Sequence, residues 1–401
     1  MENETYQIVK YRPEFKSKLV NLQAHLWGQD QAVRAAYFDW KYNWNPYVDG
    51  IYIYLAFCNE KLVGMVGAYG VQWEIGDAGQ SWPALCFADL IIIPDHRHGN
   101  LLQNLMSFAL EDLSDTDYAY VFDLSAAPQL TLVLLMQGWR RVFIQTAQRE
   151  THQATTSGQG QKNEKRRSWI ASVYRQSRRY SRRVPMLAST YHRLRGLFSR
   201  CADEPRSTFA DLDRNAGQRE ANPYISLSKT SRPRAKAELV ERIGTDGRIR
   251  HVRDEQYFSW RFQNPLSEYR FLFWDDGRFD GYLALQSKCA CEADGWAYIV
   301  DWEATNGRVW TDLLQAVIQL GNFDGLYIWS ETLSGDAKEW LREAGFYFLN
   351  KTGKVRNDSQ GENIFVKAIC PASPQSRWVL NNQDLLDARN WDLRMIYSDA
   401  Y

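Results

Sequence analysis

The sequence lacks several features that mark specialised classes of protein. Its 48 basic and 48 acidic residues leave no net charge, and no apolar run is long enough to span a bilayer. The first residues contain no apolar segment of the signal-peptide kind. The chain has only six cysteines, and none belongs to a Cys-x-x-Cys pair, so we expect reduced thiols and no metal site. These absences favour a cytoplasmic protein.

The length of 401 residues predicts more than one domain, because a domain typically contains about 100–200 residues. Two stretches, 151–168 and 202–237, are polar and irregular in pattern, as linkers often are. We therefore expect an N-terminal domain over 1–150, a linker over 151–237 and a C-terminal domain over 238–401.

The first 150 residues alternate between strand and helix patterns. The run at 101–113 has apolar residues at helical spacing, and Gly138 suits the end of a second, shorter helix. In chain order we expect strands at 51–57, 62–71 and 83–93, a helix at 101–113, a strand at 118–124, a helix at 128–137 and a strand at 139–146.

A motif of the N-terminal part returns near residue 260. Residues 37–42 read Tyr-Phe-Asp-Trp-Lys-Tyr, and residues 257–262 read Tyr-Phe-Ser-Trp-Arg-Phe. An Asn-Pro pair follows each copy, and strand and helix patterns then recur in the same order. This order predicts a duplicated domain, the alternative being two unrelated α/β domains.

The element order and the stretch 88–102, Ala-Asp-Leu-Ile-Ile-Ile-Pro-Asp-His-Arg-His-Gly-Asn-Leu-Leu, resemble the GCN5-related N-acetyltransferase (GNAT) superfamily in its tandem form. In that family an Arg/Gln-x-x-Gly-x-Gly/Ala loop follows the fourth strand and opens a helix. Here Arg97 takes the first position, while Asn100 and Leu102 replace the two small residues. The resemblance implies an α/β fold with mixed (α+β) sheets, in which a basic helical linker joins two tandem acyl-CoA N-acyltransferase-like domains.

The resemblance also implies a binding site for acetyl-CoA or another acyl-CoA as co-substrate. A helix N-terminus presents unpaired N–H groups and the positive end of a dipole, which suit the CoA pyrophosphate. The implied cofactor-binding residues are Ile91, Ile92, Ile93, Arg97, His98, Gly99, Asn100, Leu101 and Leu102.

For catalysis, the family often places a base on the fourth strand, and here Asp89 occupies such a position. The usual tyrosine acid is absent, because Leu134 and its counterpart Leu341 stand where it is expected. Tyr120 and Asp123 are the candidate substitutes, and proton return by water is the alternative. No such loop precedes the C-terminal helix at 309–320, so we interpret the second domain as degenerate for CoA.

The linker contains a basic amphipathic helix over 169–184. One face carries five arginines, and apolar residues lie opposite. Such a face can bind a membrane surface, another polyanion or tRNA, or it can belong to a solvated connector. The arginines are Arg175, Arg178, Arg179, Arg182 and Arg183.

The resemblance implies an acyl-CoA-dependent N-acyltransferase that acetylates an amine, and it suggests an amino sugar or glycan precursor as acceptor. The alternatives are a ligase of the Fem type, which uses aminoacyl-tRNA to extend cell-wall peptides, and a non-catalytic binding protein. The basic helix favours the ligase, and Leu102 with Leu134 favours the binding protein. A peripheral membrane location is compatible with the basic helix.

Overall fold

A computed structural model describes residues 5–76, 80–150, 207–216, 222–288, 295–349, 362–369 and 377–399. One compact unit combines Met1–Glu150 with Thr208–Tyr401, and a second unit is Thr151–Ser207. The predicted arginine helix therefore lies outside the described residues. Within the described ranges, no helix has both the length and the apolar character that crossing a membrane requires.

The elements follow the predicted order, and the structure adds several that the sequence patterns did not indicate. The helices are α1 (Lys16–Leu22), α2 (Ala24–Trp27), α3 (Gln31–Phe38), α4 (Leu101–Ser114), α5 (Thr131–Met136), α8 (Ala210–Ala216), α9 (Pro233–Ile243), α10 (Glu255–Arg261), α11 (Gly307–Leu320) and α12 (Gly335–Glu343). The strands are β1 (Tyr6–Lys10), β2 (Tyr52–Cys58), β3 (Lys61–Glu74), β4 (Ser81–Ile92), β5 (Tyr120–Asp123), β6 (Arg140–Ile144), β7 (Thr146–Glu150), β8 (Ile225–Ser228), β9 (Arg250–His251), β10 (Ser267–Asp275), β11 (Phe279–Lys288), β12 (Trp296–Ala304), β13 (Gly325–Trp329), β14 (Tyr347–Leu349), β15 (Glu362–Ala368), β16 (Val379–Leu380) and β17 (Gln383–Asp384).

Two mixed sheets have the same strand order. The first sheet runs β1-β2-β3-β4-β5-β15-β6, with β9 beside β3, and the second runs β8-β10-β11-β12-β13-β7-β14. In each sheet one parallel pair, β4–β5 or β12–β13, lies among antiparallel pairs. The predicted mixed α/β fold with two tandem units is confirmed.

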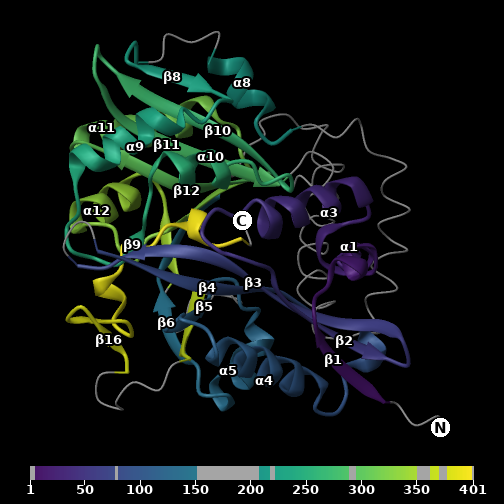
Figure 1. The fold of residues 1–401 in the computed structure, drawn as a ribbon. Coiled ribbons are helices and arrows are strands. Elements are labelled where there is room, and N and C mark those ends of the chain that lie inside the picture. The colour runs from purple at the N-terminus through teal and green to yellow at the C-terminus, as the bar shows by residue number, and fades with distance from the viewer. Residues whose placement is uncertain are drawn as a thin grey trace. The chain divides into compact units, whose positions relative to one another are not determined.

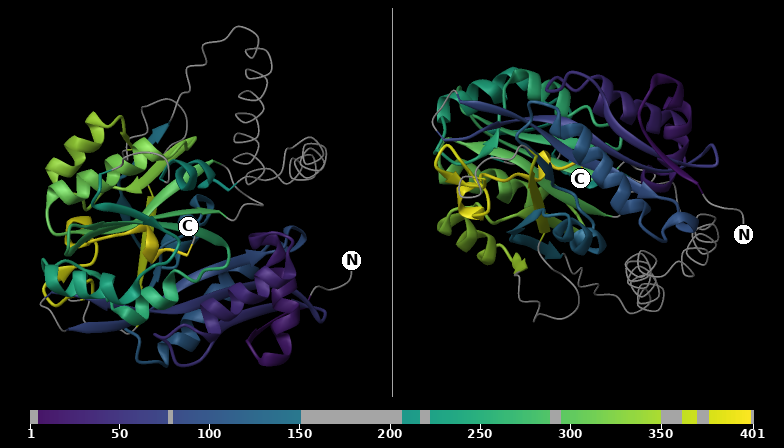
Figure 2. Two further views of the ribbon diagram at one scale, coloured as in Figure 1. Left: turned by 90° about the horizontal axis from the view of Figure 1, so that it is seen from above. Right: turned by 60° about the horizontal axis from the view of Figure 1, so that its bottom comes forward.

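Each half of the chain lends one strand to the sheet of the other half. Strand β7 pairs with β13 and β14, and β15 pairs with β5 and β6. In Figures 1 and 2 the yellow C-terminal part of the chain runs beside the blue strands of the first sheet. The exchange ties the two halves together through backbone hydrogen bonds rather than through side chains alone.

The repeated motif lies where the two halves meet. The indoles of Trp40 and Trp260 stack with centroids 5.3 Å apart, and each Nε1–H donates to the carbonyl of the other tryptophan at 2.8 Å. The side chains of Asn45 and Asn264 each accept a hydrogen bond from the backbone N–H two residues later. Corresponding residues of the two motif copies thus make the same hydrogen bonds, which supports a duplicated domain.

Apolar helices cover one face of the first sheet. Helix α4 buries Leu101, Leu105, Ala109 and Leu113 against β2 and β3, as its helical spacing predicts. Figure 1 shows α4 and α5 together on this face. This packing fixes the start of α4, and the connection from Ile92 to Leu101 is where the CoA loop is predicted.

The structure differs from the predicted linker at its C-terminal end. Helix α8 and strand β8 belong to the part that we assigned to the linker, yet β8 pairs with β10 in the second sheet, and Phe209 and Leu212 are fully buried. Their polar neighbours hide this burial in the sequence. The other predicted boundaries of the two domains and the linker stay predictions.

Candidate active site

The first component of the site is a turn of π-helix. Helix α3 continues into a π turn over Asp39–Asn43, in which Trp40, Lys41 and Tyr42 are all buried. A normal α-helix distributes three successive residues around its axis, so one of them commonly faces solvent. Turns of π-helix are rare and occur frequently at functional sites.

The second component is Asp89, at an irregular position of β4. The register between β3 and β4 shifts between Met65 and Gly67, and Asp89 has a φ of 53°. Aspartate visits this left-handed region more easily than most residues. Such backbone strain clusters at functional sites, where the surroundings hold it in place.

Four side chains donate hydrogen bonds to the Asp89 carboxylate. Lys41 Nζ lies 3.1 Å from Oδ1, and Tyr42 Oη lies 2.7 Å from Oδ2. Trp27 Nε1 donates to Oδ1 at 3.1 Å, and Gln23 Nε2 donates to Oδ2 at 3.3 Å. Both oxygens of Asp89 are therefore occupied.

The third component, Asp399, comes from the far end of the sequence. Its Oδ2 accepts from Lys41 Nζ at 2.6 Å, and the side chain is 5% exposed. Burial opposes ionisation, but the Lys41 ammonium holds the pKa of Asp399 below its usual value. Lys41 thus links two buried carboxylates, Asp89 and Asp399.

Asp123 lies at the end of β5 and is also buried. Burial raises its pKa to about 7, although the backbone N–H of Ser125 stabilises the carboxylate. The negative charge of Asp399 raises the pKa of Asp123 further, and Lys41 acts in the opposite direction. A carboxyl group with this pKa changes protonation near neutral pH, as a general base must.

Tyr120, the other candidate acid, is oriented elsewhere. Its hydroxyl donates to the carbonyl of Arg377 at 2.9 Å, and burial raises its pKa above the ordinary value. Of the three catalytic candidates, Asp89 and Asp123 both interact with the Lys41 charge. The Tyr120 hydroxyl is instead bonded to the backbone of Arg377.

Strands β4 and β5 share a short parallel pairing next to these carboxylates. The paired positions are Leu85 with Val121 and Cys86 with Phe122. Strand β5 then ends at Asp123, whereas β4 continues to Ile92. The later residues of β4 thus extend past the end of β5, and Asp89 lies within this extension.

The predicted CoA loop forms the connection from β4 to α4. It begins with a single 3-10 turn, and Gly99 takes a φ of 65°, which glycine adopts without strain. The Asn100 side chain does not cap α4. Arg97 Nε donates to the carbonyl of Ile92 at 2.7 Å, and Leu102 packs half-buried on the core instead of entering the loop.

The corresponding place in the second sheet is filled by the chain itself. Asp301 lies beside a register shift of β12, as Asp89 does on β4. Arg253 Nη1 donates to Asp301 at 3.1 Å, and Arg394 Nη2 donates to Glu303 at 2.9 Å. Both acids are buried and paired with arginines of the same chain, so they are not available to a cationic acceptor.

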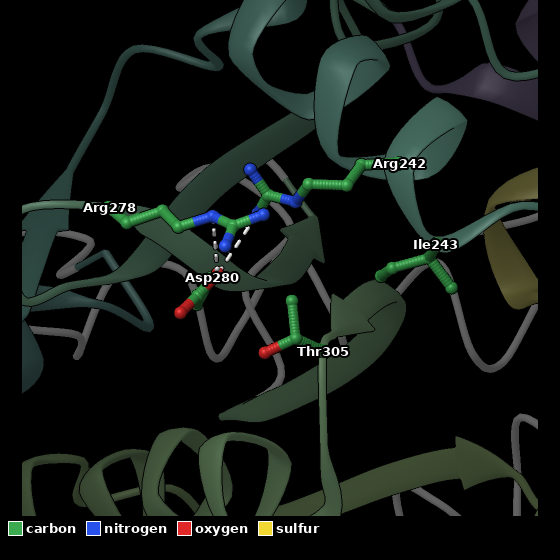
Figure 3. Close-up of a pocket in the computed structure, with 5 residues that line it drawn as sticks. All are labelled: Arg242, Ile243, Arg278, Asp280 and Thr305. Carbon is green, nitrogen blue, oxygen red and sulfur yellow. Dashed lines mark hydrogen bonds and ion pairs between the residues drawn. The ribbon is translucent and has the colours of Figure 1, made fainter.

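A separate pocket of about 400 Å³ lies in the C-terminal half and is shown in Figure 3. Arg242 donates to Asp280 at 3.0 Å, and Arg278 lies 3.6 Å from the same carboxylate. None of the predicted site residues lines this pocket. Among the described residues, no group of three or more His, Cys, Asp or Glu side chains is placed to hold a metal ion.

Three site residues were not predicted from the sequence: Lys41, Tyr42 and Asp399. The repeat motif contained the first two, but it was interpreted only as a sign of duplication. A lysine flanked by aromatic residues in a buried helical pattern is a usable signal, because buried lysines are almost always paired. No local pattern marks Asp399.

Glycine at position 67 creates the space for Tyr42. A Cβ atom there would lie 2.1 Å from Tyr42 Oη, so we expect Gly67→Ala to displace the hydroxyl from Asp89 and to lower the free energy of unfolding by about 1–3 kcal/mol. Gly307→Ala is the control, since its Cβ would meet nothing within 4 Å. Urea unfolding measures both, and equal stabilities would contradict this account of Gly67.

Comparison with protein families gives a match in the N-terminal half. Residues 7–131 match a family model described as an acetyltransferase (GNAT) domain. The matched region spans β1 to the start of α5, and it includes Lys41, Asp89, Asp123 and the loop before α4. Among curated proteins, none matches the sequence significantly.

Two solved structures share the fold over most of the chain. A GCN5-related N-acetyltransferase from Anabaena variabilis ATCC 29413 is 11% identical with a TM-score of 0.53. A conserved protein of unknown function from Enterococcus faecalis V583, described as a "Probable N-Acyltransferase", is 12% identical with a TM-score of 0.51. Each comparison covers 91% of this chain and 73% of the other. At these identities the likeness concerns the fold alone.

Proposed function

Since residues 7–131 belong to the GNAT superfamily of acetyltransferases, we propose that this protein transfers an acyl group from an acyl-CoA to an amine at one site in its N-terminal half. The family match confirms the resemblance predicted from the sequence and the predicted class of enzyme, an acyltransferase. Acetyl-CoA is the donor that we propose. The acceptor that we propose is a small amine, with amino sugars and glycan precursors as the first class to test.

The observation that carries this proposal is the arrangement of β4 and α4. Strand β4 extends past the end of β5, so its backbone offers hydrogen-bonding groups to an extended ligand. The ligand's phosphates would then meet the start of α4, which has no side-chain cap. Ile91 and Ile92 end strand β4, and residues 93–100 lead from there to the start of α4.

The chemistry requires few protein groups, because a thioester is already activated. The site must hold the amine near the carbonyl carbon and accept a proton from it. Asp123 is the proton acceptor that we propose, because it is buried at the end of β5 and has a pKa near 7. We assign Asp89 to positioning, since both of its oxygens already accept hydrogen bonds.

We propose that the C-terminal half binds no CoA. The side chain of Asn306 accepts from the N–H of Val309 and so caps α11, the helix that corresponds to α4. Capping removes one of the donors that an anion would need. The cytoplasmic location and the contact of the arginine helix with an anionic surface or tRNA stay predictions.

Charge reversal at Arg97 tests the donor site. We expect Arg97→Glu to weaken CoA binding by at least about tenfold, because it places a carboxylate beside the pyrophosphate. Arg308→Glu is the matched control, since Arg308 lies at the start of α11 in the second half. Calorimetric titration with CoA should show one site per chain. Unchanged affinity in Arg97→Glu, or equal losses in both variants, would overturn the assignment.

A further inference from the structure

We propose that the acceptor binds as a primary ammonium ion and that the Asp399 side chain is the group that receives it. This inference rests on the proposed function, because it names the class of acceptor for the same site. It adds a residue that lies outside the family match and that the C-terminal half delivers into the N-terminal half.

One oxygen of Asp399 is buried and has no donor at full hydrogen-bonding geometry, although the Ser125 side chain helps to lower the pKa of this carboxyl group. Lys41 and Tyr37 both approach Oδ2, at 2.6 and 3.4 Å. Among the described residues, Oδ1 has no hydrogen-bond partner. A buried carboxylate oxygen without a donor is costly, and the N–H of a bound ammonium would satisfy it.

The charged groups around this oxygen have a net charge of −1 when all of them are ionised, so one more cation would neutralise them. Asp89, Asp123 and Asp399 carry three negative charges when ionised, and Lys41 and Arg261 are the cations that act on Asp399. A bound ammonium makes the set neutral. Without it, Asp123 can balance the set by holding a proton, in agreement with the direction in which its pKa is shifted.

Backbone contacts fix Asp399 in place. Arg261 donates from Nε to the carbonyl of Ile396 at 2.6 Å and from Nη2 to the carbonyl of Ser398. The hydroxyl of Tyr69, on β3, donates to the carbonyl of Tyr397 at 3.1 Å. Both halves of the chain therefore hold the segment that ends in Asp399, so its carboxylate is preorganised to receive a ligand.

The proton balance of the transfer assigns a role to each carboxylate. Asp399 holds the ammonium while one of its protons passes to the Asp123 carboxylate. The neutral amine attacks the thioester carbonyl, so a C–N bond forms and the C–S bond breaks. The leaving thiolate takes the second proton that the nitrogen loses, and Asp123 releases the first to solvent. The products are the amide, free CoA and one proton.

The test compares two probes that differ in charge, n-butylammonium and n-butanol. We expect the wild-type protein to bind the ammonium at least about tenfold more tightly than the alcohol in ligand-observed NMR without CoA. Asp399→Asn should weaken ammonium binding by at least about tenfold, because it removes the charge and keeps the shape. Asp387→Asn, at a partly exposed carboxylate paired with Arg389, should leave the binding of both probes unchanged.

Equal binding of the two probes by the wild type would overturn the proposal, and this comparison needs no variant to fold. Unchanged ammonium binding in a folded Asp399→Asn variant would overturn it as well. Because the probes are measured without CoA, a failure of CoA to bind would contradict the proposed transferase and leave the ammonium site standing. Normal CoA binding with no preference for the ammonium would contradict the ammonium site and leave the proposed transferase standing.

Discussion

Replacing Lys41 by methionine is expected to destabilise the protein by about 3–5 kcal/mol. The substitution removes the ammonium between Asp89 and Asp399, and all three side chains are at least 95% buried. Removing one member of a buried pair leaves uncompensated charge in a medium that solvates it poorly. Chemical denaturation at pH 7 measures the loss, and acyl transfer should disappear with it because the carboxylates no longer keep their positions.

Lys16→Met is a matched control for this prediction. Lys16 also lies 2.6 Å from an aspartate, Asp39, but its side chain is 38% exposed. Such surface pairs contribute about 0–1 kcal/mol, so we expect only a small effect.

A double variant isolates the pair itself. Adding Asp399→Asn to Lys41→Met should recover part of the lost stability, since one of the unpaired charges is gone. A Lys41→Met variant as stable as Lys16→Met, or strictly additive effects in the double variant, would contradict the buried network.

Local patterns were enough to predict most of the first sheet and the position of α4. Apolar residues recur at helical spacing over 101–113, and α4 occupies Leu101–Ser114. The strand expected at 83–93 is β4. Helix α4 and strand β4 could be predicted because each buries its apolar residues, and such residues recur in the sequence with the period of the element.

The exchange of strands could not be predicted from the same patterns. The single strand expected at 139–146 divides into β6 and β7, which pair in different sheets. Strand β15 pairs with β5 across more than 200 residues of chain. Periodicity records which face of a strand is buried but not which strand lies beside it.

For the same reason the site was only partly predictable. Asp89 and Asp123 lie in the motif-bearing half and could be proposed from the family pattern. Asp399 follows a segment without periodic structure, and only the fold brings it to Lys41. The π turn that buries both Lys41 and Tyr42 is equally hidden, because its sequence continues an ordinary helical pattern into Asp39–Asn43.

The pH dependence of stability should reveal Asp123. Its pKa is raised from 3.8 to about 7 in the folded protein, so the folded state binds the proton more tightly than the unfolded state does. The contribution of this group to stability is therefore complete below about pH 4 and is lost as the pH rises to 7. Asp123→Asn cannot ionise, and at pH 8 we expect it to be more stable than the wild type by on the order of 4 kcal/mol, less the cost of the substitution itself.

Asp213→Asn provides a control of opposite sign. Burial disfavours the charged form of Asp213, but the Arg270 guanidinium, 2.6 Å away, holds its pKa below the usual value. Its carboxylate therefore stabilises the protein at neutral pH and loses this effect in acid, so Asp213→Asn should be less stable than the wild type at pH 7 and closer to it at pH 3. Melting temperatures of the three proteins between pH 3 and pH 8 measure both trends. If the difference between Asp123→Asn and the wild type does not change with pH, Asp123 is ionised throughout and is not the proton acceptor.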